Sequence, residues 1–175
     1  MKVARPESAV RVRLGKIRQT SGGGDARGRR FALVVSRFNA ALTAALAETA
    51  VAALRECGAA ARDIRVVWVP GAYESPWAVD RLAARGGVDA FIALGCVIQG
   101  ETPHARLIGE QVTRALSDIA RARGVPVIDG VVTANTEEQA RARCRPGPHS
   151  RGRYAALAAV EMASLAARLR EEEAT

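Results

Sequence analysis

The sequence predicts one α/β domain, in which a small parallel sheet is covered by helices on both faces. Short apolar runs rich in Val, Ile, Leu and Phe recur along the chain and alternate with longer segments that have helical spacing. The apolar runs are continuous, as in strands that are buried on both faces. Strands that alternate with helices form right-handed β-α-β units, so we expect a doubly wound sheet of four parallel strands.

The first half of the domain predicts strand, helix, strand and helix in that order. Residues 31–36 form a continuous apolar run, and the Ala/Leu-rich stretch 40–55 has helical spacing up to the stop signal Cys57-Gly58. The β-branched run 64–69 predicts a second strand. Residues 74–84 predict a second helix, which Gly86-Gly87 would close.

The second half repeats the alternation. We expect a strand at 89–94, a helix at about 105–122 that ends at Gly124, and a strand at 125–133 that is interrupted at Asp129-Gly130. A capping-box pattern at 136–139 opens another helix, and the last helix runs from about 153 to 171. The apolar face of the helix at 105–122 is predicted to be Leu107, Ile108, Val112, Ala115, Leu116 and Ile119.

The positive charge of the chain is concentrated before the domain. The net charge is +8, but residues 1–30 hold nine basic and two acidic residues, so residues 31–175 are almost neutral. We therefore expect a basic arm at 1–30 and one domain at 31–175. Within the arm, Val10–Leu14 alternates like an edge strand and Thr20–Asp25 resembles a flexible glycine-rich linker. A solvated or partner-packed arm is favoured over contact with nucleic acid.

Composition excludes several classes of protein. The three cysteines, Cys57, Cys96 and Cys144, form no CxxC pair, which favours a reducing compartment and argues against a disulfide framework or a zinc site. No apolar run reaches membrane-spanning length and no signal-peptide pattern is present, so we expect a cytoplasmic protein. Both lysines lie in the arm, which argues against a Schiff-base lysine in the domain.

The stretch Gly95–His104 is the most informative part of the chain. It follows an apolar run and precedes a helix, and ligands of open α/β sheets bind beside the carboxyl ends of strands. Thr102 is predicted to cap the helix, with Pro103 and His104 in its first turn. An anion site at the helix start and an imidazole would then share one rim. Arg37-Phe38-Asn39 and Gly71–Glu74 also follow strands, so we expect all three turns to converge.

Four motifs in one order resemble the 6,7-dimethyl-8-ribityllumazine synthase family, in register from about residue 31 to 168. They are Ser36–Asn39, Pro70–Glu74, Ala93–His104 and Glu137–Ala140. The resemblance implies a flavodoxin-like, three-layer fold and the condensation of 5-amino-6-ribitylaminouracil with 3,4-dihydroxy-2-butanone 4-phosphate in riboflavin synthesis. It implies no metal and no cofactor. It also implies a homopentamer that remains single, pairs, or assembles into a sixty-subunit shell, with riboflavin synthase as a further candidate partner.

The resemblance also implies roles for individual residues. His104 would be the general acid/base, and Phe38 would stack on the pyrimidine, with Asp129 at the position of a second aromatic residue from the neighbouring subunit. Further contacts to the pyrimidine or ribityl chain would come from Ala72, Tyr73, Glu74, Cys96, Val97 and Ile98. The phosphate would be held by Glu101, Thr102, Arg143 and Arg151.

The sequence departs from the family pattern close to the expected substrate. Ala105 and Arg106 replace an aromatic and an acidic residue, and Asp129 replaces the second aromatic residue. These changes leave two alternatives open: a divergent member with another substrate, or a non-catalytic protein that forms shells or binds flavin. Single residues also have plainer interpretations. Phe38 could be a core residue, and Trp68 and Trp77 could pack in the core or at a subunit contact. Cys96 could be either core packing or a nucleophile with His104 as its base.

Overall fold

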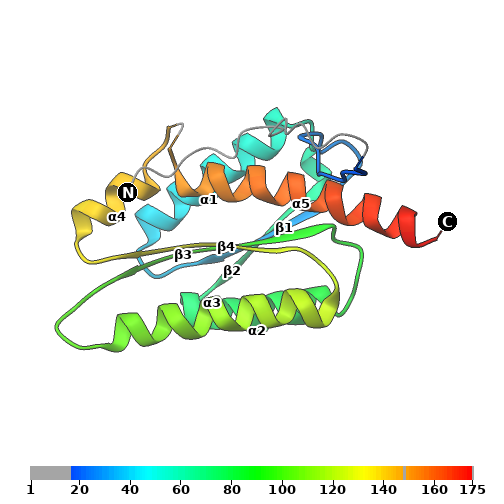
Figure 1. The fold of residues 1–175 in the computed structure, drawn as a ribbon. Helices are drawn as coiled ribbons and strands as arrows, with labels where there is room; N and C mark the ends of the chain where they lie inside the picture. The colour runs from blue at the N-terminus through cyan, green and yellow to red at the C-terminus, as the bar shows by residue number, and fades with distance from the viewer. Residues whose placement is uncertain (1–16, 148, 175) are drawn as a thin grey trace.

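The computed structural model describes residues 17–147 and 149–174, and it confirms the predicted fold class (Figure 1). Four parallel strands lie in the order β2-β1-β3-β4. Helices α1, α4 and α5 cover one face of this sheet, and α2 and α3 cover the other. The strands are β1 (Phe31–Ser36), β2 (Ile64–Val69), β3 (Ala90–Ile98) and β4 (Val127–Ala134).

The helices begin and end close to their predicted positions. They are α1 (Ala40–Glu56), α2 (Ser75–Ala83), α3 (His104–Arg123), α4 (Glu137–Cys144) and α5 (Arg151–Glu173), with short 3₁₀ turns η1 (Ala61–Asp63) and η2 (Ala72–Glu74). α3 ends at Gly124, as predicted, and this glycine adopts the left-handed conformation. Thr136 Oγ1 accepts a hydrogen bond from the Gln139 amide, which confirms the predicted cap of α4. None of the helices in the described ranges is long and apolar enough to cross a membrane.

The core consists of two layers, one on each face of the sheet. Along β1, Phe31, Leu33 and Val35 point to α1 and α5, whereas Ala32 and Val34 point to α2 and α3. All five side chains are at most 1% exposed. This burial on both faces explains why β1 is a continuous apolar run rather than an alternating one.

Two predictions about the strands are wrong. β3 does not end at Leu94 but continues to Ile98, because β4 pairs with it along its whole second half. β4 is not interrupted at Asp129-Gly130, since both residues pair in register with Ala93 and Leu94. Gly130 marks close packing rather than a turn: a Cβ atom there would lie 2.6 Å from Leu94 Cδ2 and 2.9 Å from the Ala93 carbonyl oxygen.

The segment that precedes β1 packs against α5 (Figure 1). Ala26 is fully buried and its amide donates to the Cys57 carbonyl oxygen at 2.9 Å. Nearer the start, Arg168 Nη1 of α5 donates to the Ser21 carbonyl oxygen at 2.8 Å. Gly22 lies so close to α5 that a Cβ atom would be 2.0 Å from the Glu161 carbonyl oxygen. Thr20–Asp25 therefore packs on the domain, instead of behaving as the predicted linker; the predicted strand Val10–Leu14 lies outside the described residues.

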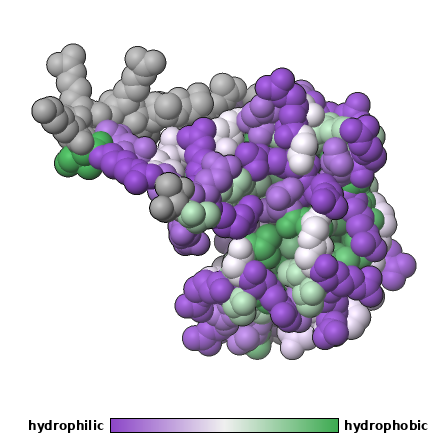
Figure 2. All heavy atoms as spheres, turned by 90° about the vertical axis from the view of Figure 1, so that its right-hand side faces the viewer, coloured by the Kyte–Doolittle hydropathy of each residue, from purple (hydrophilic) through white to green (hydrophobic). Residues whose placement is uncertain are grey.

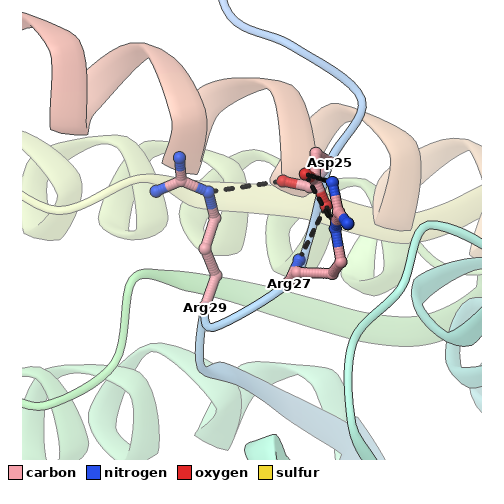
Figure 3. A network of polar contacts seen from close by, with 3 residues as sticks. All are labelled: Asp25, Arg27 and Arg29. Carbon is pink, nitrogen blue, oxygen red and sulfur yellow. Dashed lines mark hydrogen bonds and ion pairs between the residues drawn. The ribbon is translucent and has the colours of Figure 1, made fainter.

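A small polar network holds the end of this segment (Figure 3). The Asp25 carboxylate accepts hydrogen bonds from the Arg27 side chain, the shortest at 2.7 Å, and from the Arg27 amide at 3.0 Å. Arg29 Nε donates to the Asp25 carbonyl oxygen at 3.4 Å. The hydrogen bonds from the Arg27 side chain, then that from its amide, lower the pKa of Asp25 from 3.8 to about 2.

Acidification is expected to weaken this network between about pH 4 and pH 2. The pKa of Asp25 is lower in the folded state, so its ionised form favours folding above the unfolded pKa, and this contribution is lost as the pH falls through the folded pKa. An NMR titration of the Asp25 carboxyl should give a midpoint of about 2. The midpoint should return toward 3.8 in Arg27→Gln but not in Arg62→Gln, an exposed control. A wild-type midpoint at the ordinary value would contradict the network.

Candidate active site

A cavity of about 730 Å³ lies at the carboxyl edge of the sheet, where the turns after β1, β2 and β3 meet the start of α3. This is the edge at which ligands of open parallel sheets bind. Its lining residues are Phe38, Asn39, Gly71, Ala72, Tyr73, Glu74, Cys96, Val97, Ile98, His104, Ala105, Leu107, Ile108 and Gln111. The three turns that the sequence predicts to converge therefore do so, with His104 on the same wall.

A smaller cavity of about 350 Å³ lies at the opposite edge, which Figure 2 views directly. Hydrophobic side chains gather in the middle of that face and hydrophilic ones surround them. Its lining includes Arg30, Arg123 and Arg170. Arg123 forms an ion pair with Asp80 at 2.7 Å and lies in the last turn of α3, where a cation balances the helix dipole. The positive charge of Arg123 at this edge is thus accounted for by an ion pair and a helix end. The cavity of about 730 Å³ at the carboxyl edge is the better candidate site.

The turn after β1 is tied to the end of β3. Asn39 adopts the left-handed conformation with φ 60°, and its Nδ2 donates to the Cys96 carbonyl oxygen at 2.9 Å. Phe38 donates from its amide to the Pro70 carbonyl oxygen at 3.0 Å, which joins the same turn to the end of β2. The Phe38 ring is 73% exposed, so it is not a core residue and is free to contact a ligand.

The turn after β2 places a carboxylate in the cavity. Glu74 Oε2 accepts a hydrogen bond from the Gly71 amide at 2.8 Å, and this contact fixes the side chain across η2. A Cβ atom at residue 71 would lie 2.9 Å from the same oxygen, so a larger residue there would displace the carboxylate. Tyr73 is 62% exposed beside it.

His104 is the first residue of α3, but the predicted cap is wrong. Pro103 occupies the N-cap position and no side chain caps the helix, because α3 begins one residue later than a Thr102 cap requires. Gln99 instead holds the preceding loop, with Nε2 donating to the Thr102 carbonyl oxygen at 2.6 Å. The Leu107 amide is bonded to the Pro103 carbonyl oxygen, so the amides before it in α3 remain without an intrahelical partner. These amides suit an anion.

Five of the predicted site residues do not line this cavity. Glu101 and Thr102 are exposed in the loop before α3. The Asp129 carboxylate instead accepts a hydrogen bond from Thr113 Oγ1 at 2.8 Å, and the Asp129 carbonyl oxygen accepts one from Arg151 Nη2 at 2.9 Å. Arg143 lines an adjoining cavity of about 900 Å³ between α3, the end of β4 and α4, which shares Val97 and Ala105 with the first. The other predicted residues are brought together in the first cavity: Phe38, Ala72, Tyr73, Glu74, Cys96, Val97, Ile98 and His104.

Other residues of the lining were missed from the sequence. Asn39 and Gly71 lie within motifs that the sequence singled out, and their position after strands was the available signal. Leu107, Ile108 and Gln111 follow His104 at helical spacing, which places them on one face of α3. Leu107 had been assigned to the core face but is 49% exposed. Trp68 and Trp77 are also exposed rather than core residues, at 49% and 72%.

The thiol of Cys96 is paired with another thiol. Both Cys96 and Cys144 are buried, and a side-chain hydrogen bond between them lowers the pKa of Cys96 and raises that of Cys144. The partner of Cys96 is therefore Cys144. Across the described ranges, no group of three or more His, Cys, Asp or Glu residues is arranged to hold a metal ion.

The contact between Asn39 and Cys96 can be tested with two variants at one position. Asn39→Gly removes the hydrogen bond, which is worth about 1 kcal/mol. Asn39→Ala removes it and also forces a residue with a Cβ atom into the left-handed conformation, which costs about 1 kcal/mol more. We expect urea unfolding at one fixed protein concentration to show both losses, with alanine the less stable. Equal stabilities of the two variants would contradict the strained backbone at residue 39.

Comparisons with known proteins agree with the geometry. The sequence model of the 6,7-dimethyl-8-ribityllumazine synthase family matches residues 28–167. A relative named 6,7-dimethyl-8-ribityllumazine synthase, from Desulfosudis oleivorans, is 43% identical over 143 residues, which cover 82% of this chain and 91% of the relative. Neither comparison supports a diverged substrate or a non-catalytic protein. The chain belongs to the 6,7-dimethyl-8-ribityllumazine synthase family.

Proposed function

We propose that this protein condenses 5-amino-6-ribitylaminouracil with 3,4-dihydroxy-2-butanone 4-phosphate, releasing phosphate and water and forming 6,7-dimethyl-8-ribityllumazine. The observation that carries the proposal is the cavity at the carboxyl edge of the sheet. It combines an exposed phenyl ring at Phe38, a carboxylate at Glu74 and the imidazole of His104 at a helix start. Family membership supports the same reaction and its place in riboflavin biosynthesis.

The aminouracil has a flat ring and a polyhydroxylated chain, and the cavity offers a partner for each. Phe38 presents a ring face for stacking, which is worth about 0.5–1.5 kcal/mol beyond area burial. The end of β3, from Cys96 to Ile98, lies against the same space with its backbone polar groups. Glu74 has one carboxylate oxygen engaged by the Gly71 amide, which leaves its second oxygen to accept hydrogen bonds from the hydroxyls of the ribityl chain.

His104 is assigned the proton transfers. When the amine of the uracil adds to the ketone of the butanone, the hydroxyl of the adduct must be protonated to leave as water. Elimination of phosphate and ring closure then need a proton to be removed and returned, and imidazole exchanges protons near neutral pH. The free amides at the start of α3 lie beside His104, where they hold the leaving phosphate. The imine forms between the two substrates, so the reaction needs no cofactor.

Replacing His104 should slow the chemistry more than binding. We expect His104→Ala to lower turnover about a hundredfold or more, with little change in the affinity for the aminouracil. Steady-state absorbance of the lumazine product measures the first, and fluorescence titration measures the second. His149→Ala is the matched control, because His149 is the second histidine of the chain and lies in the exposed loop before α5. Equal effects of the two substitutions would remove His104 from the mechanism.

We further infer that the complete site needs a second copy of the chain. Asp129, Arg143 and Arg151 do not line the cavity that holds His104, although the family pattern places substrate contacts at all three positions. β2 also leaves one edge of the sheet unpaired within the described residues, with Val66 and Trp68 exposed on it. Both features favour a ring of subunits, and the family pattern points to a pentamer, alone, paired or closed into a shell. A cytoplasmic location and delivery of lumazine to riboflavin synthase follow from the same proposal.

Mixed subunits would reveal a shared site. Subunits carrying His104→Ala and subunits carrying Arg143→Ala should each be nearly inactive alone. Coexpressed in one ring, they should restore about a quarter of the sites, because a head-to-tail interface then joins an intact His104 to an intact Arg143. The double variant His104→Ala/Arg143→Ala, coexpressed with itself, is the control. Activity of the mixture no higher than that of the separate variants would place both residues in a site made by one chain.

A further inference from the structure

One polar side chain of the large cavity has no part in the proposed chemistry. Gln111 of α3 lines the cavity and is exposed there. Its carboxamide forms no hydrogen bond with any other residue in the ranges that the structure describes. A carboxamide has two N–H donors on its nitrogen and an acceptor oxygen beside them. Gln111 therefore presents to the cavity a neutral group that can both donate and accept.

Gln111 lies on the same face of α3 as His104, about two turns further along the helix. Seven residues of α-helix span about 10 Å along the axis. Between the two polar side chains, Leu107 and Ile108 line the same wall. This wall of the cavity thus has an imidazole at one end, an apolar middle and a carboxamide at the other end.

A hydrogen-bond donor is needed beside Glu74. Each hydroxyl of a sugar-like chain donates one hydrogen bond and also accepts, whereas an ionised carboxylate only accepts. Glu74 alone would therefore leave the hydroxyl oxygens of such a chain without a donor. Gln111 supplies N–H donors from α3, which packs against the η2 turn that carries Glu74, and both side chains line the one cavity.

We propose that Gln111 is a further specificity-determining residue, whose carboxamide binds the hydroxyl groups at the far end of the ribityl chain. This inference deepens the proposed function and rests on it. The last hydroxyls of the chain are the part of the aminouracil most remote from the amines that react. Gln111 is likewise the α3 residue of the lining that lies farthest along the helix from His104.

The neutrality of Gln111 also suits the second substrate. A phosphate monoester is close to a dianion at neutral pH, and the cavity already contains the Glu74 carboxylate. A carboxamide binds hydroxyls without adding negative charge that would repel the phosphate. It has no proton to exchange near neutral pH, so Gln111 contributes to substrate binding and not to proton transfer. Its loss should raise the KM for the aminouracil and leave kcat nearly unchanged.

Two non-reactive ligands separate the ribityl chain from the ring. In both, a nitro group replaces the 5-amino group of the uracil, so no imine can form; one carries the ribityl chain and the other a methyl group in its place. We expect Gln111→Leu to weaken binding of the ribityl ligand about tenfold in calorimetric titrations, and to leave binding of the methyl ligand unchanged. Ser117→Leu should bind both ligands like the wild type, because Ser117 is exposed on the same helix and lines neither this cavity nor the adjoining one.

Gln111→Glu carries the test should the leucine variant fail to fold. Glutamate has nearly the same shape as glutamine but, when ionised, no donor. We expect it too to weaken binding of the ribityl ligand and not of the methyl ligand, with a melting curve like that of the wild type. Steady-state turnover of Gln111→Leu should show a KM for the aminouracil about tenfold higher at nearly the same kcat.

Wild-type affinity for the ribityl ligand in either Gln111 variant would overturn the proposal. An equal loss of affinity for the two ligands would also overturn it, because Gln111 would then act on the ring or on the fold and not on the chain. A fall in kcat at constant KM would do the same. A wild-type protein that binds neither ligand would instead count against the proposed function, so the two failures are distinguishable.

Discussion

The parallel pairing of β1 with both β2 and β3 is the constraint on which the rest of the structure depends. Because the three strands run in one direction and in register, the turns that follow them emerge at one edge of the sheet. Two hydrogen bonds then fix the central turn to its neighbours, from Asn39 Nδ2 to the Cys96 carbonyl oxygen and from the Phe38 amide to the Pro70 carbonyl oxygen. The turn between β1 and α1 is short, and the side chain of Phe38 in it is exposed and lines the cavity. A buried hydrophobic strand thus positions an exposed aromatic side chain on the cavity.

Small residues make this arrangement close and rigid. Only 4% of the chain is aromatic, and the layers approach each other over alanine and glycine instead. At Gly152 a Cβ atom would lie 2.1 Å from the Leu46 carbonyl oxygen, so α5 crosses α1 almost backbone to backbone. At Gly130 the lack of a side chain likewise lets β4 pack closely against Leu94 and the Ala93 carbonyl oxygen of β3. Layers packed this closely leave little free volume, so a displacement of one helix or strand is transmitted to the element packed against it.

Apolar patterns and the glycine and proline residues between them predicted most of the helices and strands. The remaining features depend on tertiary packing. The predicted bounds of β1 and β2 agree to the residue, because β1 is a continuous apolar run and β2 is rich in β-branched residues, although it contains Arg65 and is largely exposed. The strand break at Asp129-Gly130 was predicted wrongly, since an aspartate and a glycine usually signal a turn; here the Asp129 carboxylate is satisfied by Thr113 and the glycine permits close packing. Leu107 was assigned to the core because helical spacing cannot tell a core from a cavity wall. The packing of Thr20–Asp25 on α5 depends on residues far away in sequence, which no local pattern reveals.

Electrostatics links the proposed reaction to the proposed assembly. A phosphate monoester carries about −1.5 to −2 charges near neutral pH, whereas a helix start supplies only about half a positive charge. Within one chain the first cavity contains the Glu74 carboxylate, whereas Arg143 lines the adjoining cavity on another side of α3. A single chain therefore does not neutralise the negative charge of the phosphate in this cavity. A guanidinium from a neighbouring copy would supply the missing charge and bind two phosphate oxygens at once. Assembly would then be a condition of catalysis, because one chain alone does not bring a guanidinium to the cavity that holds His104.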